Sequence, residues 1–254
     1  MMNFPLLSIP ERDIKPRQKG ITMVMEKGLS IRETEDFLSV AGEYADIVKL
    51  GWATSCITPR LDEKLAVYRD FGVPTYFGGT LLEAFYIRGQ MDEYRRILDR
   101  YRMEYAEVSD GSIDIDQDDK CELIRTLAQQ VTVLSEVGSK STSTIIAPYK
   151  WVEMMQAELD AGSWMVIAEA RESGTVGMFR EGGEVRSDLI EEILVDIPSE
   201  RILWEAPQKS QQVWFINLLG SHVNLGNIAP EETIPLETLR LGLRGDTFHS
   251  FLHS

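Results

Sequence analysis

Short apolar runs recur along this chain, and most of them are followed by a polar or glycine-rich segment and then by residues with helical apolar spacing. A short apolar run is typical of a buried parallel strand, whereas apolar residues three or four positions apart are typical of an amphipathic helix. The alternation therefore predicts repeated strand–helix units. The predicted strands are residues 20–25, 45–50, 73–77, 105–108, 131–134, 164–168, 202–204 and an eighth strand that contains Val223.

The first predicted unit shows both the strand pattern and the helix pattern. Residues 20–25 form an apolar run, and Ser30 and Glu33 then have the spacing of a capping box, in which each side chain bonds the other residue's backbone amide. Ile31, Leu38 and Ala41 supply the apolar face of the helix that follows. This stretch predicts a strand that passes directly into a helix.

Eight such units in 254 residues have the usual size of a (β/α)8 barrel. A doubly wound open sheet is the competing architecture, but it would concentrate its functional site at one switch point. Because nearly every predicted strand ends in polar or glycine residues, we favour the (β/α)8 TIM barrel, of the α/β class. The sequence contains no repeat or long linker. We therefore expect residues 1–254 to form one barrel domain, with residues 1–18 as an N-terminal lead segment.

The composition argues against two classes of binding partner. A net charge of -15 and a pI near 4.7 argue against binding nucleic acid or an anionic membrane surface. Two isolated cysteines indicate a reducing compartment, and the charged residues near the start argue against a signal peptide. The longest uncharged stretch, residues 210–230, is too polar to span a bilayer. We expect a cytoplasmic protein that binds small molecules, and a homo-oligomer is compatible with the predicted barrel.

The stretch from residue 164 onward is the strongest sign of a functional site. An apolar run, residues 164–168, is followed by Glu169, Arg171, Ser173 and Gly174. Charged groups at the end of a buried strand need partners, either each other or a charged ligand. The serine and glycine allow backbone amides to approach an anion closely. An ordinary strand-to-helix turn with a local ion pair is the alternative interpretation.

In a barrel, all strand C-termini meet at one face, so charged residues distant in sequence become neighbours there. Crowded carboxylates resist ionisation unless a cation lies among them. Oxygen donors without a histidine or cysteine cluster favour Mg²⁺ over Mn²⁺ or Ca²⁺. Pairing of some carboxylates with lysine or arginine is the alternative. The candidate metal ligands are Glu107, Asp110, Glu136, Glu169 and Glu205.

The basic residues at the same strand ends suit an anionic substrate. Arg171 can grip a phosphate or carboxylate with two hydrogen bonds, whereas Lys49 and Lys140 can also exchange a proton. A solvated surface charge is the alternative for each of them.

Barrel phosphate sites commonly use the loops after the seventh and eighth strands. Asn224, Gly226 and Asn227 fall in this region and offer amide donors and close backbone approach. A tight turn capped by asparagine is the alternative interpretation.

Short motifs run in order from Lys15 to Thr247, and together they resemble those of the phosphosulfolactate synthase family. Plant heat-stress-associated proteins resemble the same family. The motifs are residues 15–17 (Lys-Pro-Arg), 48–55 (Val-Lys-Leu-Gly-Trp-Ala-Thr-Ser), 78–81 (Gly-Gly-Thr-Leu), 107–111 (Glu-Val-Ser-Asp-Gly), 136–140 (Glu-Val-Gly-Ser-Lys), 171–174 (Arg-Glu-Ser-Gly), 205–212, 223–228 and 236–247.

The resemblance implies a carbon–sulfur lyase, a phosphosulfolactate synthase. Such an enzyme adds sulfite to phosphoenolpyruvate with Mg²⁺ and gives (2R)-2-O-phospho-3-sulfolactate, for coenzyme M or sulfolactate biosynthesis. Lys140 matches the last lysine of the family motif Glu-Val-Gly-x-Lys, and we take it as the acid that protonates the carbon beside the new bond. Arg171 and Lys49 are expected to bind the substrate anions. The predicted substrate-binding set is Arg17, Ser173, Gly174, Asn224, Gly226 and Asn227.

Two other functions remain open. A related lyase with the same enolate chemistry would use a different nucleophile or phosphorylated acid, and a non-catalytic stress-associated protein would keep only the barrel. Glu26 stands where the family motif leads us to expect aspartate, and Ala53 stands where we expect glycine. The loop after Lys140 also looks shorter than in archaeal members. Buried carboxylates at the strand ends favour an enzyme, because a scaffold has no need of groups that disfavour one another.

Overall fold

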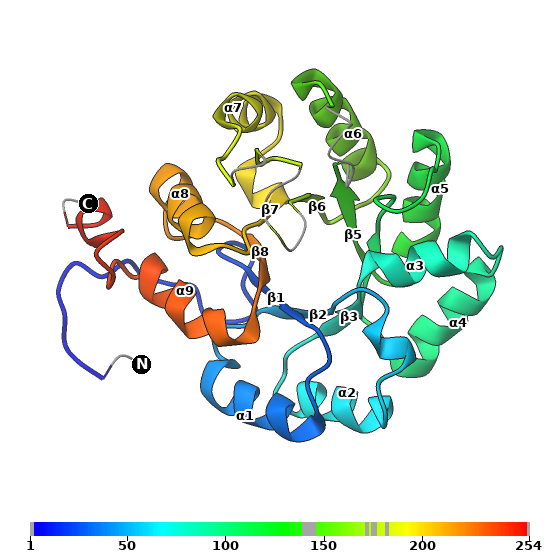
Figure 1. Ribbon diagram of the computed structural model, residues 1–254, viewed down its shortest axis with the longest axis horizontal. Coiled ribbons are helices and arrows are strands. Elements are labelled where there is room, and N and C mark those ends of the chain that lie inside the picture. The colour runs from blue at the N-terminus through cyan, green and yellow to red at the C-terminus, as the bar shows by residue number, and fades with distance from the viewer. Residues whose placement is uncertain (1–2, 139–145, 171–172, 174–176, 181–182, 253–254) are drawn as a thin grey trace.

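The computed structural model describes residues 3–138, 146–170, 173, 177–180 and 183–252. Eight parallel strands form a nearly closed barrel, and the helices surround it (Figure 1). This confirms the predicted (β/α)8 fold. No helix in the described part of the chain is both long enough and apolar enough to cross a bilayer.

Each strand is short and most of its residues are buried. The hydrogen-bonded order is β3-β2-β1-β8-β7-β6-β5-β4. Strands β3 and β4, at the two ends of this order, lie next to each other. The strands are β1 (Thr22–Glu26), β2 (Ile47–Leu50), β3 (Thr75–Phe77), β4 (Tyr105–Val108), β5 (Thr132–Val137), β6 (Met165–Ala168), β7 (Ile202–Glu205) and β8 (Leu225–Ile228).

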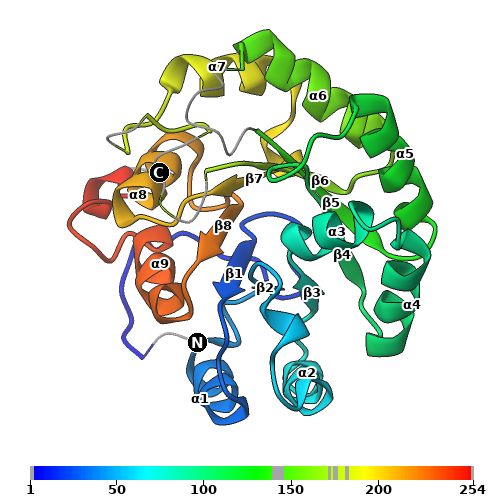
Figure 2. The same ribbon diagram turned by 45° about the vertical axis from the view of Figure 1, so that its right-hand side comes forward.

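The helices form an outer ring that both views show (Figures 1 and 2). The predicted capping box is present, because Ser30 Oγ accepts from the Glu33 amide and Glu33 Oε2 accepts from the Ser30 amide. Helix α3, directly after β3, was not predicted. The α-helices are α1 (Ile31–Ala41), α2 (Leu61–Asp70), α3 (Gly79–Tyr86), α4 (Met91–Tyr101), α5 (Gln117–Ala128), α6 (Pro148–Asp160), α7 (Ser187–Asp196), α8 (Lys209–Leu219) and α9 (Thr233–Arg240).

Apolar side chains fill the barrel interior and the layer between strands and helices. Inside the barrel, Met23, Tyr76 and Leu134 belong to one buried cluster. Outside it, Trp204 of β7 stacks on Phe215 of α8 with ring centroids 5.0 Å apart. A fully buried aromatic pair of this kind is a large contribution to the packing of a helix on a strand.

Strands β1, β2 and β3 each begin two residues later than predicted, and two other strand predictions differ more from the structure. The eighth strand begins at Leu225, so Val223 precedes it, whereas Gly226 and Asn227 lie inside it. Glycine and asparagine are typical of turns, but here Gly226 pairs with Glu205 of β7, and Asn227 lies between two residues of β8 that pair with β1. The fifth strand extends to Val137, three residues beyond the predicted end, so that Glu136 belongs to the strand itself.

The N-terminal segment is tied to the end of the barrel at which the strands begin. Arg12 donates to Glu237 of α9 at 2.9 Å and to the Gly20 carbonyl oxygen at 2.9 Å. Arg240, fully buried, donates to the carbonyl oxygens of Ser221 and Val223 at 2.7 and 2.6 Å. These guanidinium groups satisfy the hydrogen-bonding needs of backbone carbonyl oxygens near the starts of β1 and β8. The N-terminal segment therefore packs at the end of the barrel where the strands begin.

Candidate active site

The charged residues of the site follow from the alternation of side chains along the strands. Successive side chains of a strand point to opposite faces, so a residue two positions after an interior one points inward again. In β5, Leu134 lies in the interior apolar cluster and Glu136 lines a cavity above it. The same spacing recurs in the pairs Ile47 and Lys49, Tyr105 and Glu107, Ile167 and Glu169, and Leu203 and Glu205.

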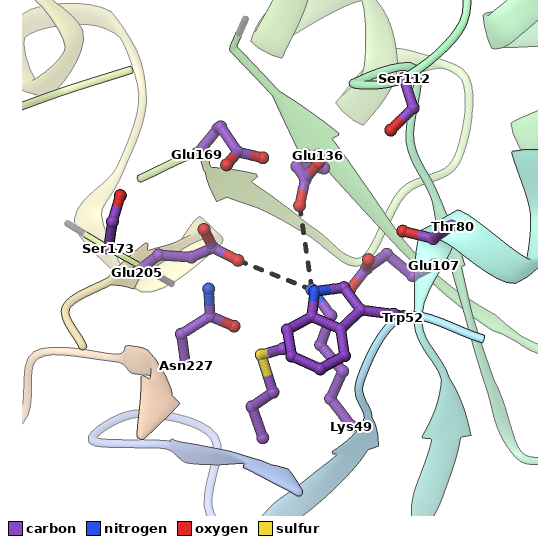
Figure 3. Close-up of a pocket in the computed structure, with 11 residues that line it drawn as sticks. Lys49, Trp52, Thr80, Glu107, Ser112, Glu136, Glu169, Ser173, Glu205 and Asn227 are labelled. Atoms are coloured by element: carbon purple, nitrogen blue, oxygen red, sulfur yellow. Dashed lines mark ion pairs between the residues drawn. The ribbon is translucent and has the colours of Figure 1, made fainter. Parts of the chain in front are cut away.

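These inward residues meet in a cavity of about 480 Å³ at the C-terminal ends of the strands (Figure 3). Charged groups from β2, β4, β5 and β7 face it, as does Glu169 directly after β6. The cavity is therefore built by most of the barrel rather than by one loop. Its lining residues are Met25, Lys49, Trp52, Thr80, Glu107, Ser112, Glu136, Glu169, Ser173, Glu205 and Asn227.

Lys49 is the cation at the centre of this arrangement. It is only 6% exposed, and its Nζ lies 2.9 Å from Glu107 Oε2. The same Nζ lies 3.8 Å from Glu136 Oε2 and 3.6 Å from Glu205 Oε1 (Figure 3). Burial alone would lower the pKa of Lys49, but the three carboxylates outweigh burial and raise it. Lys49 is therefore protonated at neutral pH.

Glu136, Glu169 and Glu205 form the most compact acidic group. One carboxylate oxygen of each lies within 4.8 Å of the corresponding oxygens of the other two, and all three residues are buried. Burial and, to a smaller extent, the neighbouring Glu136 raise the pKa of Glu205 to about 7, against the opposing effect of Lys49. A backbone amide partly opposes this rise in the pKa, because Ala170 N donates to Glu205 Oε2 at 3.0 Å. Oxygen donors crowded in this way suit a hard divalent cation.

Two glycines make room for Glu169. A Cβ atom on Gly177, whose φ is +68°, would lie 2.0 Å from the Glu169 carbonyl oxygen. A Cβ atom on Gly138 would lie 2.5 Å from the Glu169 Cβ. Real Cβ atoms do not approach other atoms so closely, so both positions require glycine while Glu169 keeps this place.

The other two predicted metal ligands have different partners. Glu107 accepts a hydrogen bond from the Gly79 amide at 2.7 Å, in addition to its ion pair with Lys49. Asp110 lies in the loop after β4 and pairs with Lys120 of α5 at 3.1 Å. Neither belongs to the compact group that Glu136, Glu169 and Glu205 form within the described residues.

Asn227 faces the cavity because of a local break in strand geometry. Its φ is +55°, in the left-handed region that asparagine tolerates better than most residues. Leu225 and Ile228 belong to the outer apolar cluster, and the irregular backbone between them directs Asn227 into the cavity. The buried Asn227 Oδ1 has no hydrogen-bond partner within the described residues. Strained, unsatisfied groups of this kind are common at ligand sites.

Three predicted substrate residues do not line this cavity and have other contacts in the structure. Arg17 donates to Asp46 Oδ1 at 2.9 Å, beside the start of β2, at the opposite end of the barrel. Asn224 likewise binds the Ile21 amide through Oδ1 at 3.0 Å, where β1 and β8 begin. A Cβ atom on Gly226 would lie 2.8 Å from Met23 Cε, so this glycine makes room for core side chains. Sequence spacing alone could not tell that Arg17 and Asn224 lie at the end of the barrel opposite the cavity.

Ser173 is the described member of the predicted 171–174 motif, and it lines the cavity. Its carbonyl oxygen accepts from Gln208 Nε2 at 2.6 Å, just before α8. This bond joins the segment after β6 to the segment after β7. The predictions for Lys140, Arg171 and Gly174 lie outside the described residues.

Several lining residues were not predicted from the sequence, and Trp52 is the largest of them. Its side chain is 44% exposed at the cavity, its φ is +53°, and Lys27 Nζ lies 5.6 Å from the ring centroid. Its position two residues after the end of β2 was the available signal, because residues just after barrel strands face the same end. Thr80 and Ser112 also line the cavity, and they lie three and four residues after the ends of β3 and β4.

Comparison with known proteins identifies the family of this chain. The model of the (2R)-phospho-3-sulfolactate synthase (ComA) family matches residues 10–246. Phosphosulfolactate synthase of Methanothermobacter thermautotrophicus is 43% identical over 244 residues, which cover 94% of this chain and 95% of that protein. Phosphosulfolactate synthase of Bacillus subtilis is 38% identical, and the match covers 97% of this chain and 99% of that protein.

A solved structure supports the fold alone. The crystal structure of 3-hexulose-6-phosphate synthase from Salmonella typhimurium has a TM-score of 0.56 and 14% identity, and the match covers 92% of this chain and 99% of that one. The family is shown instead by the model that matches most of the chain and by relatives well above 30% identity. This chain belongs to the phosphosulfolactate synthase family.

Proposed function

We propose that this protein is a phosphosulfolactate synthase, a carbon–sulfur lyase that adds sulfite to phosphoenolpyruvate and gives (2R)-2-O-phospho-3-sulfolactate. The observation that carries the proposal is the group of Glu136, Glu169 and Glu205 at the ends of three neighbouring strands, beside the buried cation Lys49. The matched family and the names of its relatives supply the substrate class.

The residues present fit a bound Mg²⁺. The three glutamates offer only oxygen donors, which Mg²⁺ prefers, and burial together with the neighbouring Glu136 raises the pKa of Glu205 to about 7. Such a group is stabilised by a divalent cation among its oxygens. When bound, Mg²⁺ would offset the negative charge that sulfite attack drives into the carboxylate of phosphoenolpyruvate. We propose Glu136, Glu169 and Glu205 as its protein ligands.

Lys49 is suited to hold charge rather than to transfer a proton. Its raised pKa keeps it protonated at neutral pH, so it is a poor acid for a rapid catalytic step. It instead offsets the negative charge of Glu107, Glu136 and Glu205 around two anionic substrates that would otherwise repel each other. We therefore retain Lys140, by its position in the family motif, as the proposed proton donor.

The polar side chains around the carboxylates are proposed to orient the substrates. Ser173 and Asn227 line the cavity on the same side as Glu205, and both carry neutral hydrogen-bonding groups (Figure 3). Neutral donors can bind an anion without the electrostatic repulsion that a further carboxylate would exert on it. Arg171, from the same motif as Ser173, is proposed to bind the phosphate or carboxylate of phosphoenolpyruvate.

Product formation tests this proposal directly. Purified protein is incubated with phosphoenolpyruvate, sulfite and Mg²⁺, and phosphosulfolactate is detected by mass spectrometry, with EDTA and Lys140→Ala samples alongside. We expect product that requires the metal and falls by at least ~100-fold in the variant, the usual loss for a missing general acid. Turnover close to wild type in Lys140→Ala would remove Lys140 from the mechanism. If phosphoenolpyruvate binds and no product forms, the nucleophile is not sulfite.

We propose a cytoplasmic location for this reaction. Both cysteines are free thiols, with Cys56 exposed and Cys121 buried. An exposed free thiol is compatible with a reducing compartment, where disulfides rarely persist.

A further inference from the structure

Behind strand β5, helices α5 and α6 bury a charged pair that the proposed reaction does not use. Lys120 of α5 and Glu158 of α6 have no exposed surface, and Lys120 Nζ lies 2.8 Å from Glu158 Oε1. Gln117 Nε2 also donates to Glu158 Oε1, at 3.3 Å. Burying both charges costs free energy that their attraction rarely exceeds. Stability alone is therefore a weak reason for a lysine here.

Lys120 also contacts the candidate site from outside the cavity. Its Nζ donates to the main-chain carbonyl oxygen of Glu136 at 2.6 Å and to Asp110 Oδ1 at 3.1 Å. Glu136 belongs to the three-carboxylate group, and Asp110 lies in the loop after β4. One ammonium group thus joins the end of β5, the loop after β4 and helix α6 through Glu158.

We propose that Lys120 is a positioning residue for the cation site: by holding the Glu136 carbonyl oxygen, it fixes the direction in which the Glu136 carboxylate enters the cavity. The inference rests on the proposed function, because it assigns a role in holding the proposed cation. Lys120 is fully buried and is not among the residues that line the cavity, so it acts through Glu136. Contacts that orient a metal ligand commonly change metal affinity by about 10-fold to 100-fold.

A second buried pair in this chain provides a matched control. Lys64 of α2 is buried and lies 2.6 Å from Glu26 Oε1 at the end of β1. The other oxygen of Glu26 accepts from the amides of Gly28 and Leu29, both at 2.8 Å. Within the described residues, Glu26 is outside the three-carboxylate group. Neutralising this pair removes a buried lysine and a buried glutamate charge without touching a proposed cation ligand.

The test compares Lys120→Met/Glu158→Gln with Lys64→Met/Glu26→Gln and the wild-type chain. Each double variant removes one buried positive and one buried negative charge, so neither leaves a fully buried ion without its partner; Asp110, which loses Lys120 in the first variant, is partly exposed to solvent. Mn²⁺ binding is measured from the electron paramagnetic resonance signal of the free ion, and thermal unfolding verifies the fold. We expect roughly tenfold or weaker Mn²⁺ binding in the Lys120 variant and less than about twofold change in the Lys64 variant. In steady-state assays, saturating Mg²⁺ should restore most of the Lys120 variant's kcat.

Mn²⁺ binding by the Lys120 variant as tight as that of the wild type, or equal weakening in both variants, would overturn the inference. If wild-type protein binds no Mn²⁺, the proposed cation site fails and the role of Lys120 fails with it. Should the Lys120→Met variant not fold, Lys120→Gln/Glu158→Gln decides the question. In this variant the side chain at position 120 is one bond shorter than lysine, so it no longer reaches the Glu136 carbonyl oxygen from the same helix position. We therefore expect the same loss of Mn²⁺ affinity.

Discussion

Glu205 links the pH dependence of folding to the candidate cation site. Burial raises its pKa from 4.5 to about 7 in the folded protein, although Lys49 opposes the rise. Between these two values the folded state binds more protons than the unfolded state, so stability falls as the pH rises. The contribution is fully present below pH 4.5 and is lost as the pH passes 7. At about 1.4 kcal/mol for each pKa unit, the loss is about 3 kcal/mol.

Urea unfolding of wild type and Glu205→Gln in EDTA, at pH 5 and pH 8, measures this loss. The neutral amide cannot titrate, so the wild type should lose about 3 kcal/mol more than the variant between the two pH values. Added Mg²⁺ at pH 8 should recover stability in the wild type more than in the variant, because the cation favours the ionised carboxylate. Equal pH dependence in the two proteins would refute the assignment of the raised pKa to Glu205.

Two substitutions test the surroundings of the carboxylates. Lys49→Met leaves Glu107, Glu136 and Glu205 without their buried cation; we expect a loss of about 3–5 kcal/mol in unfolding free energy, and an unchanged urea midpoint would contradict it. Gly177→Ala should displace Glu169 and weaken Mg²⁺ binding by about tenfold in calorimetric titration. Gly72→Ala is the control, because Gly72 has a similar φ of +65° and open space around it. This variant should lose only about 1 kcal/mol of unfolding free energy and bind Mg²⁺ as the wild type does.

Much of the fold could be predicted because its signals are local. Apolar runs and helical spacing identified the strand–helix units, and the Ser30 and Glu33 capping box was read from two residues alone. Strand β8 was misplaced because Gly226 and Asn227 are typical of turns. Their membership in the sheet depends on pairing with β1 and β7, which are far away in sequence.

The site could be predicted only as a set of strand-end residues. Glu136, Glu169 and Glu205 were among five candidate metal ligands, and the structure brings these three together. The sequence could not distinguish Glu107 and Asp110 from these three ligand candidates, because their partners come from other elements. The Gly79 amide donates to Glu107, and Lys120 pairs with Asp110. Local patterns carry no information about such long-range partners.

The position of the bound cation is the most direct test of this account. Crystals of the protein soaked in Mn²⁺ would be measured at the manganese absorption edge. The account predicts one strong anomalous peak among the carboxylate oxygens of Glu136, Glu169 and Glu205, at the ends of strands β5 to β7. A peak elsewhere in the barrel, or Mn²⁺ that binds in solution without a peak at these residues, would contradict it.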